Sequence, residues 1–292
     1  MISFDGIFTP VITPFKKNYD INYNSLEKIL EFLIKNKVHG IVIGGTTGEY
    51  YAQTIEERVS ILKFAKDVVK NKVHLMAGVT ALTSKDSLYL ASVAKQLKYN
   101  SLLVGTPPYS QPTQTESANH FIAIHQSSKL PIMMYNFPAK MGFEIGPDFL
   151  QKVMKYKNFL SIKHNSSDPS MIRYFAEHYP QLQISCGADL QVLEYYSWGA
   201  KSWVGGCSNF IPKQHISVFN NAIHKKNFDS ARKDLLKIMP TINFINSIGK
   251  YNQSVKVAMN ELGFNVGTTR LPSQPLTNVE QKLFKKYLQS IL

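Results

Sequence analysis

The sequence predicts an α/β protein built as a (β/α)8 barrel with a C-terminal helical extension. Eight short apolar runs are separated by stretches in which apolar residues recur every three or four positions, and this alternation is typical of βαβ units that form a parallel sheet. The length of 292 residues also fits a single barrel, because such barrels commonly contain about 250 residues or more.

The eight expected strands are the apolar runs, at residues 6–13, 40–45, 74–79, 101–107, 131–138, 159–164, 182–187 and 202–207. Amphipathic helices are expected between them, and clear patterns lie at residues 23–37, 54–71, 84–98 and 168–180. Thr54, Ser84 and Asp168 stand at the starts of three of these helices. Their side-chain oxygens make them the expected N-caps.

From about Phe228 to the last residue, the sequence pattern predicts helices only. Three further helical patterns follow there, including those at 230–245 and 279–292. We therefore expect a catalytic barrel over residues 1–227 and a helical extension over residues 228–292 that packs on it. The alternative is a doubly wound sheet, which is less favoured because no GxGxxG turn follows the first strand.

The charge balance is basic, with 33 Lys and Arg against 20 Asp and Glu and a formal net charge of +13. Such a balance can indicate nucleic acid, an acidic membrane surface or small anionic substrates. No zinc-finger spacing or RNP-like aromatic box is present, and the lysines are scattered along expected helices instead of forming a basic arm. We therefore expect no nucleic-acid partner. Examples of scattered lysines are Lys35, Lys37, Lys66, Lys70 and Lys72.

The two cysteines and the apolar runs bear on the cellular compartment. Cys186 and Cys207 lack metal-ligand spacing, so buried thiols in a reducing compartment are expected. The N-terminal residues do not form a signal peptide, and no apolar run approaches the roughly 20 residues of a membrane span. A soluble, cytoplasmic protein without a membrane partner is the expectation.

Small and hydroxyl-bearing residues follow the second expected strand, in the turn GGTTGE at residues 44–49. Backbone N–H groups in a strand-to-helix turn of this kind can face an anion, although glycines are also used simply to form tight turns. Thr46, Thr47, Tyr109, Tyr135 and Lys163 all stand at expected strand ends. In a barrel these ends meet at one mouth, where the active site lies.

Lys163 lies in an apolar context, directly after Ser161 and Ile162. Desolvation there favours the neutral amine, which is the form that attacks a carbonyl and makes a Schiff base. The alternative is a lysine that snorkels at a strand end or pairs with Asp168. Tyr135 needs a relay to exchange protons at neutral pH.

A threonine hydroxyl can complete such a relay because it both donates and accepts hydrogen bonds. Thr46, Tyr135 and Tyr109 are therefore candidates for a proton relay. A tyrosine at a strand edge is also commonly a packing residue with a solvated hydroxyl.

Six motifs carry a family resemblance in their order and spacing: GIFTPVITPF, GTTGE, TPPYSQPTQ, YNFPAKMG, SIKHNSSD and LPSQPLT. Over nearly its full length the chain resembles the dihydrodipicolinate synthase and N-acetylneuraminate lyase family of Schiff-base lyases. The resemblance implies that Lys163 forms an imine with pyruvate, that Tyr135 lies over the imine and relays protons, and that Thr46 links Tyr135 to Tyr109.

The resemblance also implies the substrate contacts and the assembly. Thr47 and Gly48 would hold the pyruvate carboxylate, and the backbone around Val204 would contact pyruvate from the far side. Tyr109 would reach the site of a neighbouring subunit, in a homotetramer built as a dimer of dimers. No metal or organic cofactor is expected.

The chain departs from the synthase pattern in the YNFPAKMG motif, where Lys140 and Met141 stand at the place of an arginine and a threonine. Lysine cannot offer the bidentate fork with which arginine holds a carboxylate, so aspartate semialdehyde as second substrate is in doubt. Ala81 and Leu82 stand where lysine-inhibited members have polar residues. Feedback inhibition by lysine is therefore not expected.

The sequence leaves two alternatives for each of two pairs of adjacent residues. His164 and Asn165 either face the second substrate or cap the next turn, and Tyr50 and Tyr51 either line the cavity or, as we favour, contact another subunit.

The predicted function is condensation of pyruvate with an aldehyde, of the 4-hydroxy-tetrahydrodipicolinate synthase type. The alternative within this chemistry is an aldolase, dehydratase or deaminase that acts on a 2-keto-3-deoxy sugar acid or a related keto acid. A non-catalytic barrel that binds small carboxylates is the alternative of another class.

Overall fold

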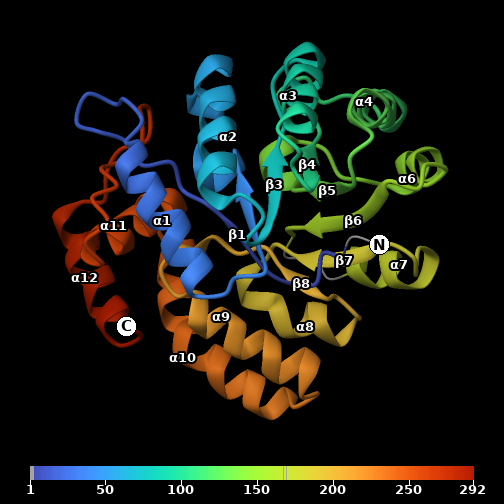
Figure 1. Cartoon of the computed structure of the whole chain (residues 1–292). Helices are drawn as coiled ribbons and strands as arrows, with labels where there is room; N and C mark the ends of the chain where they lie inside the picture. Colours follow the sequence, from blue (N-terminus) through green and yellow to red (C-terminus); the bar gives the residue numbers. More distant parts are fainter. Residues whose placement is uncertain (1–2, 167, 169) are drawn as a thin grey trace.

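Eight parallel strands close into a barrel in chain order, with β1 also paired to β8 (Figure 1). The computed structural model describes residues 3–166, 168 and 170–292. Closure confirms the predicted (β/α)8 barrel and excludes the doubly wound sheet, which is open. The strands are β1 Gly6–Pro10, β2 Gly40–Ile43, β3 His74–Gly78, β4 Ser101–Gly105, β5 Ile132–Asn136, β6 Phe159–His164, β7 Gln183–Cys186 and β8 Ser202–Trp203.

Every strand except β6 is shorter than the sequence predicts, and β1 and β8 lose the most residues at their carboxyl ends. The apolar run at 6–13 leaves the sheet after Pro10, and the Ile12 N–H donates to the Asn209 side chain at 3.2 Å instead of to a neighbouring strand. The run at 202–207 turns into a 3-10 helix at Gly206–Asn209. Both runs stay buried, so their apolar character reflects burial at the barrel mouth as well as strand formation.

Helices surround the barrel and alternate with its strands (Figure 1). They include all the helices that the sequence predicts. Their bounds are α1 Tyr23–Lys35, α2 Ile55–Val69, α3 Ser84–Gln96, α4 Gln114–Ser128, α5 Pro138–Met141, α6 Pro147–Val153, α7 Ser170–His178, α8 Val192–Ser197 and α9 Pro212–Phe219.

The helix starts test the predicted caps. Thr54 caps α2 in a capping box, because its hydroxyl accepts from the Glu57 N–H and the Glu57 carboxylate accepts from the Thr54 N–H. The prediction of Ser84 is wrong by one residue. Thr83 has the extended backbone of a cap, and its hydroxyl accepts from the Asp86 N–H at 3.1 Å.

The start of α7 lies beside the predicted cap Asp168, whose carboxylate accepts from the Ser170 N–H at 2.8 Å. The predicted helix over 168–180 begins at Ser170 and ends at His178. Ser167, in the motif SIKHNSSD, and Pro169, in the predicted helix, lie outside the described residues.

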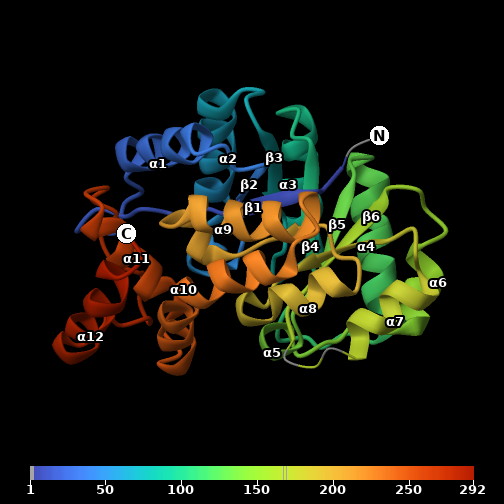
Figure 2. The ribbon, with the colours of Figure 1, turned by 90° about the horizontal axis from the view of Figure 1, so that it is seen from below.

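The C-terminal extension consists of α10 Phe228–Ser247, α11 Tyr251–Glu261 and α12 Asn278–Gln289. Figures 1 and 2 show these helices on the side of the barrel next to α1 and α9. α10 begins at Phe228, where the sequence predicts the extension to start. A boundary between two domains at 227/228 stays a prediction.

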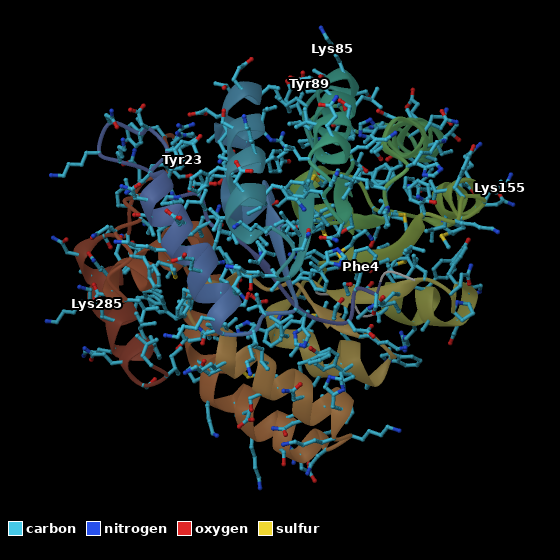
Figure 3. All side chains as sticks on the ribbon, viewed as in Figure 1. Phe4, Tyr23, Lys85, Tyr89, Lys155 and Lys285 are labelled. Atoms are coloured by element: carbon cyan, nitrogen blue, oxygen red, sulfur yellow. The ribbon has the colours of Figure 1, made fainter. Side chains whose placement is uncertain are left out.

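The core fills the barrel and the space between the strands and the helices, and Phe4 closes it at the base of the barrel. Figure 3 shows Lys85, Lys155 and Lys285 projecting outward at separate places, as expected for scattered surface charge. Cys186 and Cys207 are buried and free. No helix in the described part of the chain is long and apolar enough to cross a bilayer.

Candidate active site

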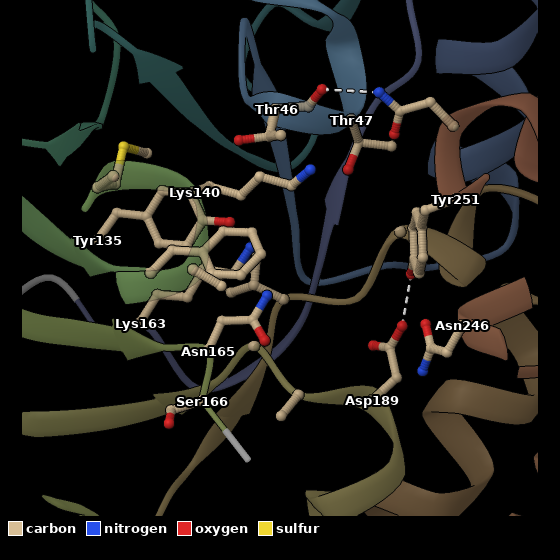
Figure 4. A pocket seen from close by; sticks show the side chains of 18 of the residues that line it. Thr46, Thr47, Tyr135, Lys140, Lys163, Asn165, Ser166, Asp189, Asn246 and Tyr251 are labelled. Atoms are coloured by element: carbon tan, nitrogen blue, oxygen red, sulfur yellow. Dashed lines mark hydrogen bonds between the residues drawn. The ribbon is translucent and has the colours of Figure 1, made fainter. Parts of the chain in front are cut away.

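A cavity of about 1000 Å³ lies at the carboxyl ends of the strands, between the barrel mouth and the C-terminal extension (Figure 4). Polar side chains from β5, β6 and the loops after β2 and β7 converge on it. Six of the residues that the sequence predicts for the site line this cavity: Thr46, Thr47, Tyr135, Lys140, Lys163 and Val204.

Lys163 stands near the end of β6 and pairs in register with Tyr135 on β5. Its side chain is 6% exposed, and its Nζ lies 4.4 Å from the centroid of the Tyr135 ring. Burial lowers the pKa of Lys163 to about 8, while Asp189 and Cys186 act in the opposite direction. A lysine with this pKa is about one-tenth neutral at pH 7, far more than a lysine with the ordinary pKa, in the direction that the apolar sequence context predicts.

Tyr135 is buried beside Lys163, and burial raises the pKa of its hydroxyl, while interactions with Thr46 and Asn165 lower it. Thr46 Oγ1 is itself buried and has no hydrogen-bond partner among the described residues. The Thr46 hydroxyl is thus near enough to lower the Tyr135 pKa without meeting the geometry of a hydrogen bond.

The turn after β2 is a short 3-10 helix at Thr46–Gly48, followed by Glu49 in the left-handed conformation with φ 58°. Thr47 lines the cavity, but Gly48 lies behind it, where a Cβ atom would come within 2.9 Å of the Val11 carbonyl oxygen. Glycine is therefore required for this close approach. Within one chain Gly48 has a packing role and does not line the cavity.

Tyr109 lies outside the cavity and is 95% exposed, in a left-handed backbone conformation with φ 76°. A single chain therefore does not bring Tyr109 to Thr46. Lys140, on α5, extends over the cavity from an exposed position (Figure 4). Among the described residues that line the cavity, Lys140 and Lys163 carry the cationic side chains.

Two functional candidates were not predicted from the sequence. Asp189, in the turn after β7, is 6% exposed and accepts hydrogen bonds from Trp203 Nε1 at 2.8 Å and from the Tyr251 hydroxyl (Figure 4). Burial raises the pKa of Asp189, while its two donors and Lys163 lower it. Asp189 follows a strand, as Thr46 does, so the convergence of strand ends at the barrel mouth could have predicted it. Tyr251 lies on α11, and no sequence pattern places it at the mouth.

The structure separates the positions of His164 and Asn165, and it places Tyr50 and Tyr51 together at the cavity. Asn165 lines the cavity, whereas His164 points away, with Nδ1 3.0 Å from the Asn136 amide and a pKa lowered to about 4 by burial. Tyr50 and Tyr51 both line the cavity. Tyr51 is 54% exposed, so a subunit contact stays compatible with its position.

The rest of the cavity wall combines apolar side chains with several neutral polar ones. Amide and hydroxyl side chains come from the C-terminal extension and from the loop after β6, namely Asn246, Asn252, Gln253, Ser273, Asn165 and Ser166. Such groups form directional hydrogen bonds with hydroxyl or carbonyl groups and add no charge.

Residues 3–291 match the sequence profile of the Dihydrodipicolinate synthetase family. The chain belongs to this family. Its members are class I aldolase-type lyases. The chain is similar to a 4-hydroxy-tetrahydrodipicolinate synthase of Caldicellulosiruptor bescii, with 30% identity over 288 residues that cover 99% of this chain and 97% of the relative.

Solved structures of the family have the same fold. The dihydrodipicolinate synthase DapA-2 of Bacillus anthracis superposes with a TM-score of 0.94, at 29% identity and with 100% of both chains covered. The chloride-inhibited dihydrodipicolinate synthase of Acinetobacter baumannii, solved with pyruvate, superposes with a TM-score of 0.93 at 26% identity, covering 99% of this chain and 100% of the other. The similarity extends over the barrel and the C-terminal helices together.

Proposed function

We propose that this chain is a pyruvate-dependent lyase that forms an imine at Lys163. The observation that carries the proposal is a buried lysine with a pKa of about 8, facing the ring of Tyr135 in a cavity at the carboxyl ends of the strands. Family membership and the pyruvate complex of the Acinetobacter baumannii relative support the same chemistry.

In the proposed reaction the neutral Lys163 amine attacks the keto carbon of pyruvate. The carbonyl oxygen takes one proton from the attacking nitrogen and a second through Tyr135 and then leaves as water, which gives the protonated imine. Loss of a proton from the methyl group then forms an enamine, whose terminal carbon adds to the carbonyl carbon of a second substrate. Water finally hydrolyses the imine and returns the free lysine.

The surrounding residues have separate proposed tasks. Tyr135 exchanges protons with the imine and its precursors, and Thr46 connects it to the rest of the relay. Thr47 holds the pyruvate carboxylate in the turn after β2, with Gly48 shaping that turn, while the Val204 backbone closes the opposite side.

The default second substrate is an aldehyde, in a condensation of the 4-hydroxy-tetrahydrodipicolinate synthase type, as the names of the relatives suggest. A specific observation favours the alternative, an aldolase, dehydratase or deaminase of a 2-keto-3-deoxy sugar acid or related keto acid. The cavity offers Lys140 in place of a bidentate arginine, and its other wall carries neutral amides that suit hydroxyl groups. A non-catalytic carboxylate-binding barrel would not need the buried Lys163.

We further propose a cytoplasmic homotetramer, built as a dimer of dimers, in which Tyr109 completes the relay of a neighbouring subunit. The support is the exposure of Tyr109 together with the unpartnered Thr46 hydroxyl in the described part of the chain.

Reductive trapping tests the proposed function. The protein is incubated with pyruvate and borohydride, and the modified residue is found by mass spectrometry of peptides. We expect one pyruvate-derived adduct, at Lys163, and none in the Lys163→Ala variant. Modification of another lysine, or of none, would refute the proposal. A panel of aldehydes and of keto-deoxy sugar acids, followed by the consumption or release of pyruvate, then identifies the second substrate.

A further inference from the structure

Helix α11 of the C-terminal extension contacts both ends of the turn that follows β2. The Asn252 amide donates to the Thr46 carbonyl oxygen at 3.0 Å, and Lys256 Nζ lies 2.6 Å from a carboxylate oxygen of Glu49. Asn252 and Lys256 are four residues apart and therefore share one face of the helix. One helix face thus holds Thr46 and Glu49, which bracket Thr47 in the turn.

The ion pair between Lys256 and Glu49 is fully enclosed, with the two side chains 1% and 0% exposed. Lys256 also donates to the Thr268 carbonyl at 2.9 Å and lies over the Phe15 ring, and Glu49 accepts from the Arg270 N–H at 3.0 Å. A buried pair with these additional bonds is costly to break, because either charge alone would be left uncompensated. Glu49 is therefore held firmly at one position.

The backbone of Glu49 needs this support. Its φ of 58° lies in the left-handed region, which costs free energy for a residue other than glycine and persists where the surroundings enforce it. The Glu49 N–H bonds back to the Thr46 carbonyl at 3.0 Å, and this is the same oxygen that Asn252 binds. The conformation of the turn thus depends on partners outside the barrel.

The residue before Asn252 reaches another part of the same mouth. Tyr251, beside Asn252, donates to Asp189 in the turn after β7. Two consecutive residues of α11 therefore contact the turns after β2 and β7, and a rigid helix links these two parts of the cavity wall.

We propose that α11 positions the carboxylate-binding turn, and that Asn252 and the Glu49–Lys256 pair thereby set the affinity for the α-keto acid. The inference rests on the proposed function, in which Thr47 holds the carboxylate. Glu49 and Lys256 do not line the cavity and act only through the turn. Asn252 lines the cavity and acts through the Thr46 carbonyl.

Two variants remove the two contacts separately. Asn252→Leu keeps the approximate side-chain volume and removes the donor to Thr46. The double variant E49Q/K256M removes both buried charges together, so that neither is left unpaired. Lys250→Met is the matched control, because Lys250 stands at the start of α11 and its ammonium group pairs with Glu280 at 2.7 Å instead of with a residue of the turn.

Two measurements are made on each variant. Hydrogen–deuterium exchange of residues 44–53 in the ligand-free protein reports the turn itself and requires no substrate; we expect exchange about tenfold faster in both variants. The second-order rate constant of borohydride trapping should fall about tenfold or more with pyruvate. With pyruvamide, which has a neutral amide in place of the carboxylate, it should change less than about twofold. Lys250→Met should leave both measurements unchanged.

Several outcomes would overturn the inference: unchanged exchange in both variants, an equal fall with pyruvate and pyruvamide, or the same losses in Lys250→Met. If the double variant does not fold, Asn252→Leu decides alone by the same criteria. Failure of the wild-type protein to trap pyruvate would refute the proposed function instead. Faster exchange at 44–53 would in that case still support the positioning of the turn by α11.

Discussion

Lys163 and Tyr135 are paired in register across β5 and β6, and the lysine nitrogen lies 4.4 Å from the centre of the tyrosine ring. Because both residues belong to strands of a closed barrel, their separation is fixed by the ladder between those strands and not by a loop. The amine and the phenol are therefore preorganised before any substrate arrives.

The rate of imine formation should depend on pH through the ionisation of Lys163. Only the neutral amine attacks, so the rate of trapping with pyruvate should rise with pH and level off above a pKa of about 8. Asp189 raises the pKa of Lys163, so Asp189→Asn should move the midpoint to lower pH. Trapping rates measured between pH 6 and 10 test this; an unchanged midpoint in Asp189→Asn would show that the two groups are not coupled.

Tyr135→Phe removes the hydroxyl and keeps the ring that packs over Lys163. Turnover should fall roughly 10²-fold or more, the usual scale for a positioned acid-base group. Steady-state kinetics with the preferred substrate measure the effect, and circular dichroism checks that the variant is folded. Near-normal turnover in a folded variant would remove Tyr135 from the proton relay.

Complementation between two inactive variants should reveal the role of Tyr109. Tyr109→Phe and Lys163→Ala subunits should each have low activity, whereas a mixed dimer contains one site with both groups intact. After complete random exchange, about a quarter of the wild-type activity should return. If Tyr109 instead serves the site of its own subunit, every site in the mixed dimer stays damaged and no activity returns.

The cation at position 140 should affect the choice of second substrate. Lys140→Arg supplies a bidentate fork and should raise kcat/KM for aspartate semialdehyde about tenfold if the fork alone is missing. Lys140→Met, which has no cation, should lower it. Parallel assays with keto-deoxy sugar acids serve as the comparison. No gain with the arginine variant would favour the sugar-acid alternative.

Local patterns in the sequence predict most of the architecture. The alternation of apolar runs and amphipathic stretches predicts all eight strands, because each element must bury one face and this requirement is satisfied within a few residues. The prediction misses where elements end. Ser84 is not the cap of α3, since the choice between adjacent Thr83 and Ser84 depends on the backbone that each adopts.

The sequence also predicts some residues of the candidate site and misses others. Lys163, Tyr135 and Thr46 could be predicted from the sequence because strand ends of a barrel converge on one mouth whatever the loops do. The convergence of strand ends does not decide whether Tyr109 and Gly48 contribute to the site. In a single chain neither residue lines the cavity. Asp189 follows a strand as well and could have been found by the same reasoning.

The sequence by itself determined the barrel, the position of the lysine and the family. Only the tertiary structure decided which residues of the C-terminal extension close the cavity. Asn252 donates to the Thr46 carbonyl over a separation of 206 positions, and Tyr251 reaches Asp189 over 62 positions. The physical reason is that periodicity records which face of a helix is buried but not the distant segment that it is buried against, which depends on how whole elements pack.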